Sequence, residues 1–146
     1  ALRGRSEKLI VEPGRVLVGN AGVLLTRVEY LKHGEEKNFA IVDAAMNDLI
    51  RPAFYEAHHD IRPVDERRAA APPETVDVVG PICESTDTFD VHELPSLRRG
   101  DVVAIADAGA YAASMAMTYN GRPRPPQVLL EADGTLTLGR RRGGAR

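Results

Sequence analysis

The sequence predicts a mainly β domain, an antiparallel barrel or sandwich with a few short helices, preceded by a segment of a different kind. About six or seven short runs rich in β-branched residues are separated by Gly, Pro and Asp turn signals, which favours an all-β architecture. Helical patterns are few and short. Residues 1–25 instead combine a strand-like run with an apolar helix-like run, which makes one βα unit.

The first unit is predicted from two neighbouring patterns. Residues 8–11 form a short apolar strand that ends at Glu12-Pro13-Gly14, where proline and glycine favour a turn. Residues 15–25, RVLVGNAGVLL, are apolar on nearly every side, so a buried helix is expected. Gly19 and Gly22 weaken that helix or mark a close backbone approach.

The β domain is predicted over residues 26–139. Alternation and β-branched content predict strands at 26–33, 38–46, 60–64, 75–82 and 101–107, and a hairpin around Asp133-Gly134. Residues 34–36 form a turn, and residues 65–74 and 83–101 are expected to be irregular. A short helix at 49–57 would be capped by Asn47 or Asp48 with Pro52 in its first turn, and an alanine-rich helix spans 108–117. Residues 140–146 are predicted to be a disordered tail.

Composition argues against several functional classes. With 43% hydrophobic and 27% charged residues, the 146-residue chain has the composition of a globular protein. Its net charge of −2 creates no electrostatic field that would favour binding to nucleic acid or an anionic membrane. No apolar run approaches the roughly 18 to 20 residues that span a bilayer, and no secretory signal is evident, so a cytoplasmic location is expected. The single cysteine excludes an intrachain disulfide and a Cys-rich zinc site. The adjacent His58 and His59 point in different directions on a strand or helix, so no metal site is expected.

Two short motifs in the first half of the chain carry candidate chemistry. Glu12, Gly14 and Arg15 lie at the end of the first predicted strand, where ligand sites collect in α/β proteins. Arg51 and Tyr55 are four residues apart, so one helix face would present a guanidinium and a phenol to a carboxylate. Taken singly, the first motif fits a surface turn equally well, and the second fits a solvated helix face.

Two further motifs lie in the second half. Cys83 and Glu84 follow a strand directly, and a thiol there can act as an acid or nucleophile if its pKa is tuned. The turn at residues 107–111 precedes a predicted helix, whose first N–H groups could face an anion such as phosphate, with the Tyr111 hydroxyl beside them. A structural cysteine and a glycine turn with a core tyrosine are the alternative interpretations.

In this order and spacing, the motifs resemble the fold-type III decarboxylases that use pyridoxal phosphate. The matching stretches are EPGRVLVGNAGVLLTRV, DAAMNDLIRPAFYEAHHDI, VVGPICESTDTFD and GDVVAIADAGAYAASMAMTYNGRPRPPQVLL. MNDLIRPAFYEAHH and CESTD are similar to the branch that acts on diaminopimelate, and Glu84 stands where ornithine-type relatives usually carry aspartate. The resemblance implies that residues 1–25 are the last βα unit of a TIM-type (β/α)8 barrel that holds the cofactor.

The resemblance also implies residue roles toward the cofactor. Glu12 would face the protonated pyridine nitrogen, and Gly14 would let the backbone approach closely. Arg15 and Tyr111 would bind anionic oxygens at the phosphate and substrate end.

The roles toward the substrate, meso-diaminopimelate, follow in the same way. Arg51 and Tyr55 would bind the distal carboxylate, and Glu84 the distal ammonium. Cys83 would return a proton to the α-carbon. In the family the Cys-Glu loop enters the neighbouring subunit's site, so the resemblance implies a homodimer with shared active sites.

The lysine that anchors the cofactor in this family has no counterpart here, since Lys8, Lys32 and Lys37 do not occupy a matching position. The chain alone is therefore predicted to be inactive, as part of a longer carboxy-lyase. Two alternatives stay open: a related ornithine, arginine or carboxynorspermidine decarboxylase, and a non-catalytic β domain that serves dimerisation or regulation.

Overall fold

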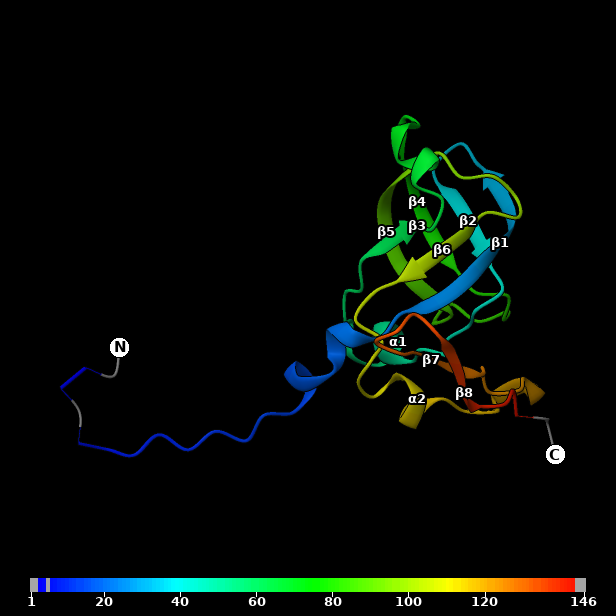
Figure 1. Ribbon diagram of the computed structural model, residues 1–146. Helices are drawn as coiled ribbons and strands as arrows, with labels where there is room; N and C mark the ends of the chain where they lie inside the picture. The colour runs from blue at the N-terminus through cyan, green and yellow to red at the C-terminus, as the bar shows by residue number, and fades with distance from the viewer. Residues whose placement is uncertain (1–2, 5, 144–146) are drawn as a thin grey trace.

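The computed structural model describes residues 3–4 and 6–143, and its strands form a strongly curved sheet with a separate hairpin beside it (Figure 1). The six-stranded sheet has the order β3-β6-β1-β2-β4-β5, and β7 pairs with β8. The strands are β1 Leu24–His33, β2 Asn38–Val42, β3 Ile61–Pro63, β4 Pro73–Val79, β5 Thr88–Pro95, β6 Val102–Ile105, β7 Gln127–Leu130 and β8 Leu136–Arg140. The helices are α1 Arg51–Tyr55 and α2 Ala112–Met115, with 3-10 turns η1 Arg15–Leu17, η2 Gly19–Ala21, η3 Glu66–Ala70 and η4 Tyr119–Gly121.

Strand pairing confirms the predicted β fold and adds one feature. β1 is antiparallel to β2 and to β6, and β4 is antiparallel to β5. β2 and β4 pair in parallel, with Phe39 opposite Asp77, so the sheet is mixed rather than purely antiparallel. The edge strands β3 and β5 lie in contact, which nearly closes the sheet into a barrel.

The core fills the inside of this curved sheet. Along β1, Thr26 and Val28 are buried while Leu25, Arg27 and Glu29 are exposed, because successive side chains point to opposite faces. Aliphatic side chains from most strands meet there, together with Phe89 of β5. The fully buried members are Val28, Ala40, Val42, Leu49, Val76, Val78, Phe89, Val103 and Ile105.

The prediction of a strand and a buried helix in the first 25 residues was wrong. Residues 6–14 run away from the domain without sheet pairing (Figure 1), and residues 15–21 form the turns η1 and η2. Val16 and Leu17 are 79% and 66% exposed, since no described surface covers them. At Gly22 an added Cβ would lie 2.6 Å from the Cα of Gly109, so the backbone here approaches too closely for a regular apolar helix.

The segment 83–101, predicted to be irregular, contains β5. Its alternation was hidden because His92, a polar residue, points inward: it is buried, and its Nε2 lies 2.8 Å from the carbonyl oxygen of Phe89. Asp90 adopts a φ of 80° within the strand, which further disturbs the pattern.

Helices were predicted too long, and turns were predicted well. The helix expected at 108–117 shrinks to α2, because Tyr111 adopts a left-handed φ of 67° directly before it. α1 begins after Ile50, with Pro52 in its first turn as predicted, but neither Asn47 nor Asp48 caps it. The 34–36 turn and the hairpin around Asp133-Gly134 are confirmed.

The other segments expected to lack structure are partly ordered. Residues 65–74 contain η3 and the start of β4. Arg140, predicted to begin a disordered tail, instead ends β8, and residues 144–146 of that predicted tail lie outside the described residues.

Candidate functional site

Arg51 lies between two tyrosine rings. It begins α1, and its guanidinium carbon is 5.5 Å from the ring centre of Tyr55, one helical turn later, as the four-residue spacing predicts. The same carbon is 5.9 Å from the ring centre of Tyr111, which lies in the turn after β6. Both distances suit cation–π contact, so two segments far apart in the sequence share one cation.

Gly14 and Arg15 complete this cluster. Arg15 Nη2 donates to the carbonyl oxygen of Asp107 at 3.4 Å, and a Cβ added at Gly14 would lie 3.4 Å from the Tyr111 hydroxyl. We use the name arginine–tyrosine group for five residues: Gly14, Arg15, Arg51, Tyr55 and Tyr111. Glu12, two residues earlier, is exposed and makes no hydrogen bond or ion pair with any described residue.

His59, dismissed from the sequence as a poor chelator, is buried beside this group. It is 2% exposed, and its Nδ1 lies 2.8 Å from the carbonyl oxygen of Ala106. Burial lowers the pKa of His59, and the positive charges of Arg51 and Arg15 lower it further. The ring is therefore neutral at pH 7, with Nδ1 as the protonated nitrogen that donates to the carbonyl.

Unsatisfied donors give the group its chemical character. Arg15 Nε and Arg51 Nε are buried, and neither has a hydrogen-bond partner among the described residues. A buried donor without a partner costs about 1–3 kcal/mol, so such atoms mark a place that a ligand or water completes. Two guanidinium groups and phenol hydroxyls suit an anion such as a carboxylate or a phosphate.

The predicted anion site on the backbone of residues 107–111 needs correction. The amides of Ala108 and Gly109 already donate to the carbonyl oxygens of Gly22 and Gly19, each at 2.9 Å. α2 has four residues, too few to give a helix dipole of consequence. These two backbone amides are therefore not free for an anion, and an anion bound at this turn would contact the side chains of Arg15, Arg51 and Tyr111 instead.

Cys83 and Glu84 lie in the loop between β4 and β5, and both are exposed. The buried carboxylate of Asp87 fixes this loop, because its two oxygens accept from the amides of Met46 and Ile82, each at 2.7 Å. The loop borders a hollow of about 390 Å³. The residues that line it are Pro81, Ile82, Cys83, Glu84, Asn120 and Arg122.

The structure brings some predicted site residues together and separates others. Among the described residues, no hydrogen bond or ring contact joins Cys83 or Glu84 to the arginine–tyrosine group, and Glu12 also lies outside it. Asp87, Tyr119 and His59 had not been singled out as site residues. Their partners are 41, 35 and 47 residues away, so no local pattern marks them.

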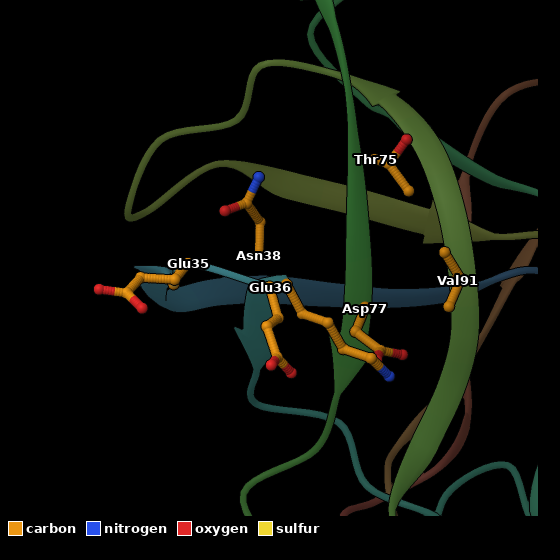
Figure 2. A pocket seen from close by; sticks show the side chains of 8 residues that line it. Glu35, Glu36, Asn38, Thr75, Asp77 and Val91 are labelled. Atoms are coloured by element: carbon orange, nitrogen blue, oxygen red, sulfur yellow. The ribbon is translucent and has the colours of Figure 1, made fainter.

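A larger hollow lies elsewhere, at the end of the β1–β2 hairpin (Figure 2). It measures about 420 Å³, and Figure 2 shows Glu35, Glu36 and Asp77 around it. Lys37 pairs with Asp77 there at 3.3 Å, and Lys32 lies over the Phe39 ring. The hollow contains none of the predicted site residues.

Residues 3–4 and 6–143 contain no group of three or more His, Cys, Asp or Glu side chains placed to hold a metal ion. Within the same residues, no helix has the length and apolar character needed to cross a membrane.

Comparison with known proteins identifies the family to which the chain belongs. Residues 16–109 match the family described as the pyridoxal-dependent decarboxylase, C-terminal sheet domain. The chain belongs to the pyridoxal-dependent decarboxylases. A diaminopimelate decarboxylase of Neisseria meningitidis serogroup A is 53% identical over 137 residues, which cover 94% of this chain and 33% of the relative. One from Pseudomonas aeruginosa is 53% identical over 140 residues, covering 96% and 33%.

Solved structures of this decarboxylase family agree with the fold. A crystal structure from Aquifex aeolicus superposes with a TM-score of 0.87 at 44% identity, covering 99% of this chain and 35% of that one. Diaminopimelate decarboxylase from Helicobacter pylori complexed with L-lysine gives 0.83 at 43% identity, with the same coverage. The chain thus spans about one third of the length of these relatives. The predicted family and the predicted mainly β fold class are confirmed.

Proposed function

We propose that this chain is the C-terminal part of a diaminopimelate decarboxylase, which converts meso-2,6-diaminopimelate to L-lysine and CO2. The observation that carries the proposal is 53% identity over 137 residues to a relative of that name. Glu84 after Cys83 and the Arg51–Tyr55 pair support this substrate over ornithine or arginine. Residues 1–25 would belong to the cofactor-binding barrel, residues 26–139 to the β domain and residues 140–146 to a tail, in an enzyme of the cytoplasm.

The arginine–tyrosine group fits one end of pyridoxal phosphate. Its unpartnered Arg15 Nε and the Tyr111 hydroxyl beside Gly14 suit anionic oxygens at the phosphate and substrate end. When bound, the cofactor supplies the electron sink that stabilises the carbanion left by loss of CO2. Glu12 would face the pyridine nitrogen and favour its protonation.

The same group would select the substrate. Arg51, positioned by two phenol rings, would bind the distal carboxylate together with Tyr55. Glu84 would accept from the distal ammonium, and Cys83 would deliver the proton to the α-carbon. Where the bound substrate buries such a charge pair, removal of one partner would cost about 2–5 kcal/mol, which is enough to reject a substrate that lacks the distal amino-acid group.

We further propose a homodimer with shared active sites. No contact among the described residues joins the arginine–tyrosine group to the Cys83–Glu84 loop within one copy of the chain, and both are needed for the roles above. A two-fold symmetric dimer would bring the loop of each subunit to the arginine–tyrosine group of the other, and so form two equal sites.

The test uses a hybrid enzyme in which residues 6–146 replace the matching third of the Pseudomonas aeruginosa relative. The hybrid is assayed for CO2 release from meso-diaminopimelate, ornithine, arginine and carboxynorspermidine, and for lysine formation from meso-diaminopimelate, with the parent relative as control. We expect turnover of meso-diaminopimelate within about tenfold of the parent and at least about a hundredfold preference over the others. Preference for another amino acid would support the related-decarboxylase alternative. A folded hybrid without turnover would support a non-catalytic dimerisation module.

A further inference from the structure

Tyr119, in the turn η4, makes a short side-chain contact with the Cys83–Glu84 loop. Its hydroxyl donates to Glu84 Oε1 at 2.7 Å, across 35 residues of sequence. A hydroxyl that donates to a carboxylate at this distance forms a charge-assisted hydrogen bond, about twice as strong as a neutral one. Glu84 is exposed, so without this contact its carboxylate would be free to rotate.

The backbone around Tyr119 is fixed to the core of the domain. Asn47 is fully buried, and its side-chain Nδ2 donates to the backbone carbonyl oxygen of Tyr119 at 2.8 Å. The backbone carbonyl oxygen of Asn47 accepts from the amide of Met117 at 3.0 Å. The backbone from which the Tyr119 side chain extends is therefore held by a buried core residue.

The loop that carries Glu84 is fixed to the same short segment. Met46, the neighbour of Asn47, donates its amide to Asp87 at 2.7 Å, and Thr86 Oγ1 lies 3.4 Å from Met46 Sδ. Arg122 Nη2 donates to the carbonyl oxygen of Asp43 at 2.6 Å. Residues 43–47 thus form one platform that holds both the glutamate loop and the Tyr119 turn in a fixed relation.

The hydrogen bond lies beside the hollow that Cys83, Glu84, Asn120 and Arg122 line. We propose that Tyr119 is a positioning residue: its hydroxyl fixes the Glu84 carboxylate at one oxygen and leaves the other to accept from the substrate's distal ammonium beside Cys83. This inference rests on the proposed function. Tyr119 acts through Glu84, so its loss should weaken substrate binding more than the chemical step.

The first part of the test measures the hydrogen bond in the 146-residue chain. The carboxylate of Glu84 raises the pKa of the Tyr119 phenol, since the bond stabilises the neutral phenol and the negative charge disfavours phenolate. Phenolate absorbance is titrated in the parent chain, in Tyr119→Phe and in Glu84→Gln. Cys83 and Arg122 line the same hollow and are left unchanged. The parent chain should show one tyrosine that titrates with a raised pKa, and this step should be absent from Tyr119→Phe. In Glu84→Gln the pKa of that tyrosine should return toward its ordinary value.

The second part measures kinetics in the hybrid enzyme. Tyr119→Phe should raise KM for meso-diaminopimelate about tenfold and change kcat by less than about threefold. In a Glu84→Gln background, the same substitution should add less than about twofold, because its effect passes through Glu84. Tyr30→Phe, at an exposed tyrosine of β1, is the matched control and should match the parent enzyme.

The outcomes separate the two proposals. A Tyr119→Phe enzyme with parental KM, or effects that add in the double variant, would overturn the positioning role and leave the proposed function intact. A Tyr119 phenol whose pKa is not raised in the parent chain would also overturn the positioning role. A parent hybrid inactive on meso-diaminopimelate would overturn the proposed function, and the inference with it.

Discussion

Asp87 should be the most sensitive polar residue of the Cys83–Glu84 loop. It is buried, and its two carboxylate oxygens accept from the amides of Met46 and Ile82, each at 2.7 Å. Asp87→Asn replaces one acceptor oxygen by an NH2 group, which then faces an N–H donor. One buried amide loses its partner, at a cost of about 1–3 kcal/mol, and Asp87→Ala, which removes both acceptors, should cost about 2–6 kcal/mol. These are large fractions of a total stability of about 5–15 kcal/mol.

The assay is urea unfolding of the 146-residue chain, followed by circular dichroism, for the parent and both Asp87 variants. Asp60→Asn is the matched control, because the Asp60 side chain is 59% exposed and pairs only with His58 and Arg62 at the surface. The control should change the free energy of unfolding by less than about 0.5 kcal/mol. An Asp87→Asn chain as stable as Asp60→Asn would refute the reasoning that this carboxylate ties the loop to the core.

Three further predictions concern stability. The native-state pKa of His59 lies below its ordinary value of 6.5, so the unfolded chain binds the proton first. Unfolding free energy should therefore fall as pH drops below 6.5, by at most about 1.4 kcal/mol per pH unit, and His59→Asn should flatten that dependence in urea titrations. Gly109→Ala places a Cβ against the Val18 carbonyl oxygen and should break the hydrogen bonds that the Ala108 and Gly109 amides donate, at a cost of about 1–3 kcal/mol in urea unfolding. Gly139→Ala, where a Cβ has room, should be nearly neutral. Burial raises the pKa of Asp48, so charge there opposes folding above that pKa, and Asp48→Asn should raise the melting temperature at pH 7.

The sequence predicted those parts of the fold that depend on local signals. The hairpin at Asp133-Gly134 and the turn after β1 follow from turn chemistry, and the Arg51–Tyr55 pair follows from helical spacing. The apolar run at 15–25 misled because apolar character alone does not distinguish a buried helix from a segment of turns whose apolar side chains stay exposed. β5 was missed because an inward-facing His92 breaks the apolar alternation.

The candidate site shows the same division between local and long-range information. Motifs indicated which side chains carry chemistry, but not which of them share a cluster. Arg51 meets Tyr111 and Tyr119 meets Glu84 only after the chain folds, through contacts that no sequence periodicity encodes. Asn47, expected to cap α1, instead anchors the Tyr119 turn, because its amide reaches a carbonyl oxygen 72 residues away.

The central claim is that the arginine–tyrosine group of one copy and the Cys83–Glu84 loop of another form one substrate site. It is tested by mixing two inactive hybrid enzymes, Arg51→Ala and Glu84→Ala, after unfolding and refolding them together. Random pairing makes about half the molecules heterodimers, each with one intact and one doubly altered site, so activity should return to about one quarter of the parent value. If activity stays at the level of the separate variants while gel filtration shows mixed dimers, each site is built within one chain, and the account is wrong.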